Sequence, residues 1–487
     1  MLVRLRSVCL ALPAVLACLT ATAQAEVKLA TIFGDSMVLQ RELPVPVWGT
    51  ADAGEKVTVT FGDQSKEATA DDAGKWQVKL DPLKASSEPQ ELKAAGSSTV
   101  VLKDVLVGEV WICSGQSNME WRLATAMNPK EEIAASDHPL IRLFDVPGHT
   151  TSPVAKDELP GGSWKVCGPQ TSGGFSAVGY FFGRRLQEEL KVPVGLVGSN
   201  WGGTRIEPWT SPAGFHSVPE LEKIAAQVDA YDENTKVGGS SPSAIYNAMI
   251  HPLAPFAMRG AIWYQGESNG NEGETYYHKT RALVNSWRKL FNPDLAFYWV
   301  QLADFRAPNE DPAGGDGWAN LREAQRKALD IDHTGMAVII DIGDAKDIHP
   351  RNKQDVGWRL SQWALHQTYD RKDLVPAGPL YKSHKVEGDS IRISFDHVGE
   401  GLMVGEKIGL EPTKEVTDGK LARFAIAGSD KKWHWADATI DGKDVVVKSA
   451  DVPNPVAVRY AFSTNPEGAN LYNRTGIPAS PFRTDSW

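Results

Sequence analysis

The middle of the chain alternates short apolar segments with amphipathic ones, and this alternation limits the possible folds more than any other feature. Candidate strands lie at 105–113, 140–146, 194–198, 258–264, 296–302 and 336–342. Between them, Ser176–Leu190 and Tyr276–Phe291 each place their apolar residues on one helical face. The unbroken apolar run Met336–Ile340 is typical of a strand that is buried on both faces of a sheet. Residues 105–374 are therefore predicted to form an α/β domain, a doubly wound parallel sheet with helices outside.

β-rich segments are predicted on both sides of this core. Lys56–Phe61 and Lys75–Leu80 alternate apolar and polar residues between turn signals, which predicts a sandwich of immunoglobulin type over residues 26–104. Alternating segments return near the end of the chain, for example at Val456–Phe462. They predict a C-terminal β domain over residues 375–487. A chain of 487 residues is long enough for two or three such domains.

The first 25 residues contain the three regions of a signal peptide in order. Arg4 and Arg6 supply a basic start, Val8–Leu19 form an apolar core, and Ala23-Gln24-Ala25 offers small residues for cleavage. The apolar core is too short to cross a membrane, and no later run reaches about eighteen apolar residues. We therefore expect no membrane span and a periplasmic or extracellular protein.

The net charge bears on which partners are expected, and the cysteine content bears on whether a disulfide forms. The formal net charge is −10 and the basic residues form no long run, which argues against a nucleic-acid partner. Cleavage of the signal would leave Cys113 and Cys167 in an oxidising compartment, where a disulfide is one alternative. The strand position of Cys113 favours two buried free thiols instead.

A serine and a histidine follow two of the predicted strands. Ser117 comes directly after the first strand, at the start of an apparent helix. The carboxyl ends of strands in an open α/β sheet face the ligand crevice, so this hydroxyl is a candidate nucleophile; a simple helix cap is the alternative. His349 follows the last strand and can act as its general base.

An acidic loop precedes His349. Asp347, two residues earlier, is the preferred group to orient the imidazole, with Asp341 and Asp344 as alternatives. A hard cation bound by these carboxylates is another interpretation, although their spacing does not match a calcium loop. A nucleophilic serine needs no metal or other cofactor, and none is predicted.

Negative charge on an attacked carbonyl requires hydrogen-bond donors. Gly202 and Gly203 follow the strand 194–198, and the lack of a side chain lets their N–H groups approach a substrate oxygen. Gln265 and Asn269 each carry an amide that can supply another bond, and Gln265 is chosen by residue type and position.

Four blocks in this order resemble the sialate O-acetylesterase family of the SGNH hydrolase superfamily. They are Gly115–Met119, Trp201–Thr204, Trp263–Ser268 and Asp347–Pro350. The resemblance implies an SGNH hydrolase core with Ser117 as nucleophile, His349 as base, and a glycine N–H and an amide side chain as oxyanion donors. In the superfamily the acid is usually an aspartate three residues before the histidine. Here that position is Lys346, and Asp347 stands two residues before the histidine.

The same resemblance suggests an acetylated sugar or glycan as the substrate. Candidate substrate-binding residues in or beside the blocks are Gln116, Asn118, Arg205 and Glu267, where Arg205 can meet a sialate carboxylate or pair with a neighbouring glutamate. We therefore expect a secreted serine carbohydrate O-acetylesterase. A plant cell-wall xylan or xyloglucan acetylesterase is the nearest alternative. A noncatalytic glycan-binding protein and a metal-dependent phosphodiesterase are alternatives of other classes.

A second serine motif competes with Ser117. Gly34-Asp35-Ser36 matches the commonest nucleophile block of the superfamily. The segments that follow it have sandwich-like alternation rather than the strand–helix alternation of a hydrolase core. Ser117 is therefore preferred over Ser36.

Overall fold

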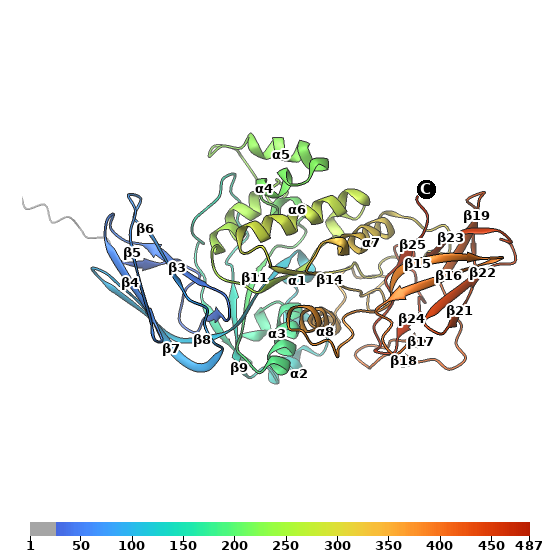
Figure 1. Ribbon diagram of the computed structural model, residues 1–487, viewed down its shortest axis with the longest axis horizontal. Coiled ribbons are helices and arrows are strands. Elements are labelled where there is room, and N and C mark those ends of the chain that lie inside the picture. The colour runs from blue at the N-terminus through green and yellow to red at the C-terminus, as the bar shows by residue number, and fades with distance from the viewer. Residues whose placement is uncertain (1–25) are drawn as a thin grey trace, which may run out of the picture.

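The computed structural model describes residues 26–487, and the predicted signal peptide lies outside the described residues. Three parts follow one another along the long axis of the molecule: a β-rich N-terminal part, a central sheet with helices, and a β-rich C-terminal part (Figure 1). Within residues 26–487, no helix has the length and apolar character needed to span a membrane.

The central part is built on a mixed sheet with the strand order β10-β9-β11-β8-β12-β13-β14. The bounds are β8 (Thr99–Gly115), β9 (His138–Asp145), β10 (Trp164–Cys167), β11 (Val194–Asn200), β12 (Gly260–Tyr264), β13 (Ala296–Val300) and β14 (Thr334–Ala337). All neighbours pair in parallel except β10, which pairs antiparallel with β9. The prediction of a wholly parallel sheet is wrong at this edge. No long helix connects β9 to β10, and only a parallel pair needs such a crossover.

Helices cover both sides of this sheet. α3 (Ala177–Leu190) packs against β9 and β11, and α8 (Lys353–Trp363) packs against β13 and β14. α6 (Glu274–Leu290) and α7 (Gly317–Lys327) lie on the opposite side (Figure 1). Trp287 of α6 contacts Trp263 of β12 and Phe297 of β13 edge-on, which anchors that helix to the sheet. The other α-helices of residues 26–487 are α1 (Ser117–Glu120), α2 (Pro129–Ala134), α4 (Pro212–His216) and α5 (Glu222–Asp229).

β8 joins the N-terminal part to the central sheet without a break. Its first half pairs with β7 (Ser86–Ala95), and its second half lies between β11 and β12. The burial pattern changes along the strand: exposed and half-buried residues alternate over 99–104, and every residue from Val105 to Gly115 is buried. The predicted boundary between residues 104 and 105 marks this change of environment, and the backbone continues through it as one strand.

The N-terminal part consists of two small groups of strands, and it contains both alternating segments singled out in the sequence. One sheet is β1-β3-β6, while β2, β4, β5 and β7 belong with the first half of β8. The bounds are β1 (Lys28–Leu29), β2 (Val38–Gln40), β3 (Val45–Thr50), β4 (Lys56–Phe61), β5 (Gln64–Thr69) and β6 (Lys75–Leu80). In β4 and β6 alternate side chains are buried, as the sequence predicted.

The C-terminal part contains three further sheets, with the orders β15-β16-β22-β21, β18-β17-β24 and β20-β19-β23-β25. Their bounds are β15 (Leu380–Glu387), β16 (Ser390–Asp396), β17 (Leu402–Glu406), β18 (Lys414–Glu415), β19 (Phe424–Gly428), β20 (Trp433–Trp435), β21 (Asp437–Asp441), β22 (Asp444–Lys448), β23 (Pro455–Tyr460), β24 (Leu471–Asn473) and β25 (Phe482–Arg483). The buried guanidinium of Arg322 in α7 donates to the carbonyls of Ser463 and Thr464, which ties this part to the core.

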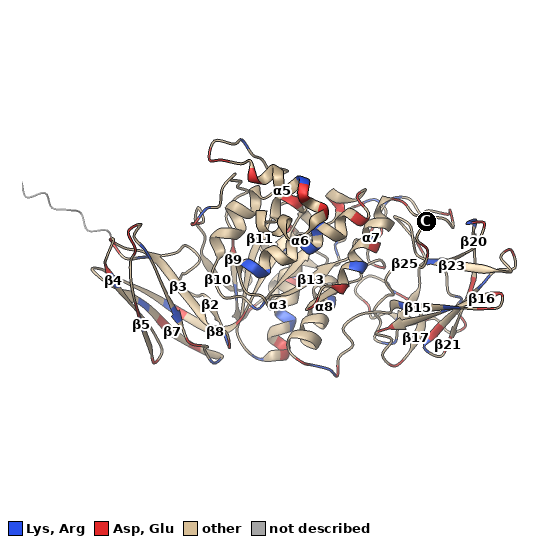
Figure 2. Cartoon of the chain, turned by 45° about the horizontal axis from the view of Figure 1, so that its top comes forward, with Lys and Arg blue, Asp and Glu red and all other residues tan. Residues whose placement is uncertain are grey.

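The structure shows where the two remaining cysteines and the surface charges lie. Cys113 and Cys167 are both buried free thiols, as the sequence favoured, and burial raises the pKa of Cys167 to about 12. Acidic and basic residues are interspersed on the outer helices α5, α6 and α7 (Figure 2). The absence of a nucleic-acid partner stays a prediction.

Candidate active site

Ser117, His349 and Asp347 lie in series at the carboxyl edge of the central sheet. The Oγ atom of Ser117, the first residue of α1, is 3.0 Å from Nε2 of His349. Nδ1 of the same ring is 3.2 Å from Oδ1 of Asp347. This is the order hydroxyl, imidazole, carboxylate in which a base can take the hydroxyl proton while an acid orients the ring.

The turn that carries Ser117 is fixed by close contact between neighbouring strand ends. Gly115 has φ +140°, and a Cβ atom there would lie 2.1 Å from the carbonyl oxygen of Tyr264, so only glycine fits. The N–H of Gln116 donates to that carbonyl at 3.0 Å, and the N–H of Trp201 donates to the carbonyl of Gly115 at 3.0 Å. The ends of β8, β11 and β12 are thereby joined around the serine.

His349 is held from two directions. Trp121, which follows α1, stacks on the imidazole with 4.9 Å between ring centroids and 20° between planes. Oδ1 of Asp347 also accepts the backbone N–H of His349 at 2.9 Å. The side chains of His349 and Asp347 are 26% and 37% exposed, so the ring is positioned yet open to a substrate.

The alternative acids are engaged elsewhere. Asp341 forms a buried ion pair with Arg359, with N–O distances of 2.6 and 2.8 Å. Asp344 accepts the backbone N–H of Lys346 at 2.8 Å in a local turn. Among the described residues 26–487 there is also no group of three or more His, Cys, Asp and Glu side chains arranged to hold a metal ion.

Ser36 belongs to a different network. Its hydroxyl donates to Asp104 at 2.8 Å, and Asp104 pairs with Arg142 of β9 at 2.6 Å. Arg142 also donates to the carbonyl of Ser36 at 3.1 Å. The Gly34-Asp35-Ser36 motif therefore stabilises the junction between the N-terminal part and the central sheet. No histidine of residues 26–487 contacts the Ser36 hydroxyl.

The glycine loop after β11 lies beside the serine. A Cβ atom on Gly202 would be 3.3 Å from the Cβ of Ser117, which places the two backbones in close contact. The N–H of Gly202 donates to Oε2 of Glu120 at 2.6 Å, and Oε1 of Glu120 lies 3.0 Å from Nε2 of His149. Gly203 has φ +74°, and its N–H has no acceptor within residues 26–487.

Gln265 does not present a hydrogen-bond donor to the region beside Ser117, in contrast to the expectation from its residue type. Its side chain is fully buried, and Nε2 donates to the carbonyl of Thr204 at 3.2 Å and to Oδ1 of Asn269 at 2.7 Å. Oε1 accepts the hydroxyl of Tyr276 at 2.7 Å. Both amide hydrogens are therefore used to fasten the glycine loop to the segment after β12.

Asn118 and Glu267, expected to bind substrate, instead form a network below the serine. Nδ2 of Asn118 donates to Glu267 at 2.5 Å and to the carbonyl of Ile348 at 3.1 Å, and its Oδ1 accepts from Lys353 at 2.5 Å. Burial raises the pKa of Glu267 and lowers the pKa of Lys353 to about 7. Lys353 was missed in the sequence because it resembles an ordinary polar residue in the first turn of a helix.

Two more candidate substrate-binding residues have structural partners. Arg205 donates to Glu207 at 3.0 Å and to the carbonyl of Ser268 at 3.2 Å, and it also forms an ion pair with Glu272. Oε1 of Gln116 accepts the N–H of Ser268 at 3.3 Å, and Gln116 is 3% exposed. Arg205 therefore has the structural role that was its alternative in the sequence.

A hydroxyl, an imidazole and a carboxylate in series at the carboxyl edge of an α/β sheet form the arrangement typical of serine hydrolases, of which carboxylic ester hydrolases are one class. Comparisons with known proteins identify the family. The model of the family described as "Carbohydrate esterase, sialic acid-specific acetylesterase" matches residues 107–360, and the chain belongs to this family.

Relatives match over nearly the whole chain. The sialate O-acetylesterase of Homo sapiens is 30% identical over 93% of this chain and 92% of its own length. The sialate O-acetylesterase of Mus musculus is 29% identical over 93% of this chain and 94% of its own length. A solved carbohydrate acetylesterase from Xanthomonas citri is 39% identical, covers 95% of this chain and 100% of its own, and superposes with a TM-score of 0.84. The predicted family and the predicted class of enzyme are confirmed.

Proposed function

We propose that this protein is a serine carbohydrate O-acetylesterase with Ser117 as nucleophile, His349 as general base and Asp347 as the orienting acid. The observation that carries the proposal is the 3.0 Å contact between the Ser117 hydroxyl and Nε2 of His349, with Asp347 on the other ring nitrogen. The names of the relatives support acetyl esters of sugars as substrates.

The reaction follows in two stages. Oγ of Ser117 bonds to the acetyl carbon while its proton passes to Nε2 of His349. The tetrahedral oxyanion then collapses, the bond to the sugar oxygen breaks, and that oxygen takes the proton from His349. Water attacks the acetyl–serine ester with His349 again as base, and acetate leaves as the Ser117 oxygen regains a proton.

Backbone N–H groups are the proposed oxyanion donors. Ser117 is the first residue of α1, so its N–H has no acceptor within the helix, and Gly202 lies against it. The N–H of Gly202 is engaged by Glu120, so a carbonyl oxygen binds there only when that carboxylate turns away. Gly203 offers a further N–H on the same loop.

The proposed core is a doubly wound sheet of SGNH type. The chain passes from β8 to β9 and β11 on one side, and then crosses β8 to build β12, β13 and β14 on the other. In α/β sheets the crevice forms where the strand order reverses, which here is the carboxyl end of β8, next to Ser117. Residues 1–25 are proposed as a cleaved signal peptide, so that the enzyme acts in the periplasm or outside the cell.

Acetate release tests the function. Wild-type protein and the Ser117→Ala variant are assayed side by side on acetylated sialic acid, acetylated xylan and acetylated xyloglucan, with Ser36→Ala as the matched control. The proposal predicts release by wild type and Ser36→Ala and only a trace by Ser117→Ala. Release by Ser117→Ala at the wild-type rate contradicts it. The preferred polymer separates a sialate esterase from a plant cell-wall esterase of the same mechanism.

A further inference from the structure

The loop that carries His349 is held at both ends by the C-terminal β part. It runs from Asp341, shortly after β14, to Asn352, the N-cap residue of α8. At one end, Asp341 accepts the hydroxyl of Tyr472 in β24 at 3.3 Å. At the other end, Nδ2 of Asn352 donates to the carbonyl of Gly409 at 3.1 Å. The proposed base lies between these two points, three residues before the N-cap.

A lysine of the C-terminal part fixes the end of the loop at α8. Nζ of Lys407, which directly follows β17, lies 2.7 Å from Oδ2 of Asp355 in the first turn of the helix, and the lysine side chain is 5% exposed. The same carboxylate oxygen accepts Nδ2 of Asn352 at 2.5 Å. Oδ1 of Asn352 in turn accepts the N–H of Asp355 at 3.0 Å. Lys407 therefore holds the carboxylate that orients the N-cap side chain.

The end of the loop at β14 is fixed by a buried ion pair and by a hydroxyl. Asp341 pairs with Arg359 of α8, and both side chains are 3% exposed. Oδ2 of Asp341 accepts from Arg359 at 2.8 Å and from Tyr472, which is 2% exposed. Because β24 pairs with β17, Tyr472 and Lys407 come from one small sheet. Both ends of the loop are thus tied to α8 and to the same part of the C-terminal region.

The position of His349 relative to Ser117 depends on how this loop is held. Asp347 belongs to the same loop as the ring, so it orients the imidazole without fixing the loop against α1. Asn118 of α1 holds the middle of the loop at the carbonyl of Ile348, and the C-terminal contacts hold its two ends. A displacement of about 1 Å in a reacting group can slow a reaction about a hundredfold.

We propose that Lys407 and Tyr472 are positioning residues for the esterase reaction, which hold the two ends of the loop so that Nε2 of His349 stays within reach of the Ser117 hydroxyl. In the described part of the chain, neither side chain forms a hydrogen bond or an ion pair with Ser117, His349 or Asp347. The inference rests on the proposed esterase function. It gives the C-terminal part a role in the chemical step.

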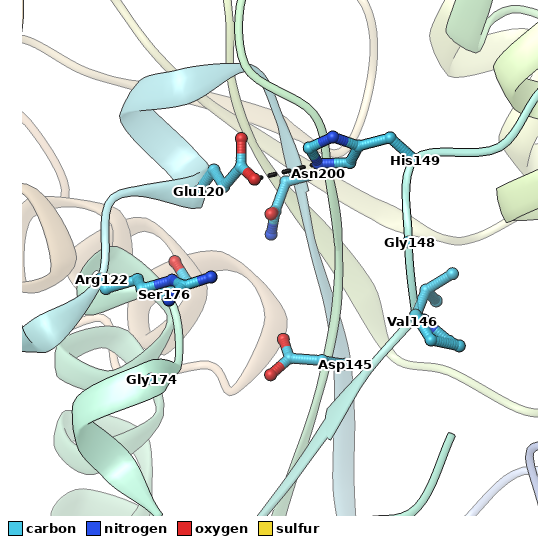
Figure 3. A pocket seen from close by; sticks show the side chains of 10 residues that line it. Glu120, Arg122, Asp145, Val146, Gly148, His149, Gly174, Ser176 and Asn200 are labelled. Carbon is cyan, nitrogen blue, oxygen red and sulfur yellow. Dashed lines mark hydrogen bonds and ion pairs between the residues drawn. The ribbon is translucent and has the colours of Figure 1, made fainter. Parts of the chain in front are cut away.

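These two residues lie apart from the pocket that opens beside the nucleophile. This pocket, of about 340 Å³, lies at the carboxyl ends of β9 and β11, and its lining includes Glu120, His149 and Asn200 (Figure 3). In the sheet, β9 and β11 are on one side of β8, and β14, which precedes the loop of the base, is on the other. Substitution of Lys407 or Tyr472 leaves the pocket lining unchanged, so kcat should change more than KM.

The test measures kcat and KM on acetylated xylo-oligosaccharide and on 4-nitrophenyl acetate, well below the melting temperature of each variant. Lys407→Met should lower kcat about tenfold or more on both esters, with KM changed less than about twofold, because a displaced base slows hydrolysis of every ester. Lys407→Arg keeps the charge and should recover most of the loss. Tyr472→Phe removes one hydrogen bond and should lower kcat by a smaller factor, about threefold.

Two controls match these variants in residue type and lie in the same part of the chain. Lys382 pairs with Asp396 at 2.8 Å, and the hydroxyl of Tyr381 is 2.7 Å from Nδ1 of His384. Both residues belong to β15, and neither contact involves the loop of the base. Lys382→Met and Tyr381→Phe should therefore keep the wild-type kcat.

Two results would overturn the inference. One is a kcat in folded Lys407→Met and Tyr472→Phe equal to that of their controls; if Lys407→Met does not fold, Tyr472→Phe decides alone. The other is a raised KM with unchanged kcat, which would assign the residues to substrate binding. A wild-type protein that hydrolyses neither ester contradicts the proposed function itself, so the two failures are distinguishable.

Discussion

At the scale of single residues, the contact between Asp347 and His349 explains how an acid two residues away can orient the ring. One oxygen, Oδ1, accepts both the backbone N–H of His349 at 2.9 Å and its Nδ1 at 3.2 Å. The short spacing is possible because the carboxylate turns back on the residue it orients. Nδ1 then carries the proton, and Nε2 is left as an acceptor for the Ser117 hydroxyl.

Replacing Asp347 tests this role. Asp347→Asn removes the charge that stabilises the protonated imidazole and permits the wrong tautomer, so kcat should fall by about two orders of magnitude or more with a smaller change in KM. Steady-state kinetics on an acetylated sugar measures it. Asp344→Asn is the control, since the hydrogen-bond partner of Asp344 within residues 26–487 is the local backbone N–H of Lys346. If kcat instead fell by this amount in Asp344→Asn while Asp347→Asn kept full activity, Asp344 would be the acid that orients the ring.

Several residues could be predicted only by type. Gln265 and Arg205 have the right donors, but their contacts with Asn269 and Glu272 depend on chain folding that spacing does not reveal. Glu120 looks like a helix-surface residue, yet it reaches Gly202, 82 residues away in the sequence. Ser117 was easier to predict because it closely follows the end of β8, and strand ends are visible in the apolar pattern. Asp347 and His349 lie in the long loop after β14, where their residue types and close spacing gave the signal.

At the scale of elements, α8, α1 and the segment after β12 are tied together by one buried network. Lys353 begins α8, Asn118 lies in α1, and Glu267 follows β12. The amide of Asn118 also donates to Ile348, directly before the base. Lys353 is therefore a positioning residue, which holds the loop of His349 against the helix of Ser117.

This network makes a prediction about stability and pH. Burial lowers the pKa of Lys353 to about 7, below its unfolded value near 10.4, so above pH 7 the unfolded chain binds more protons than the folded one. This contribution makes stability rise with pH, by at most about 1.4 kcal/mol per unit, between roughly pH 7 and 10. Lys353→Met should lose that slope. Urea unfolding of wild type and Lys353→Met at pH 7.5 and 9.5 measures how the free energy of unfolding changes with pH. The same change in both proteins would contradict the prediction.

The bounds of several helices and strands could be predicted from the sequence, but the direction of the edge strand β10 could not. The strands β4 and β6 and the helices α3 and α6 follow directly from apolar period, within two residues at each end. The antiparallel edge strand β10 does not, since strand direction depends on how the connection runs rather than on the strand's own residues.

At the scale of the whole molecule, β8 links the N-terminal part to the catalytic centre as one continuous strand, and the C-terminal part is fastened through α7. Change in side-chain burial, rather than a flexible linker, separates the first two parts. The predicted boundary therefore coincides with a change of burial pattern within one strand.

The whole-molecule account also predicts the response to metal removal. A hydroxyl activated by a histidine and an oxyanion met by N–H groups need no ion, so acetate release should persist in EDTA. The measurement is activity before and after dialysis against chelator. Loss of activity that is restored by an added divalent metal would favour the acidic-loop alternative.

Covalent labelling tests the central claim most directly. A serine-reactive phosphonate should inactivate the enzyme with one label per chain, and peptide mass spectrometry should find that label on Ser117, since this hydroxyl is the one placed against His349. The Ser117→Ala variant should take no label. A label on Ser36 or another residue in the inactivated enzyme would contradict the account.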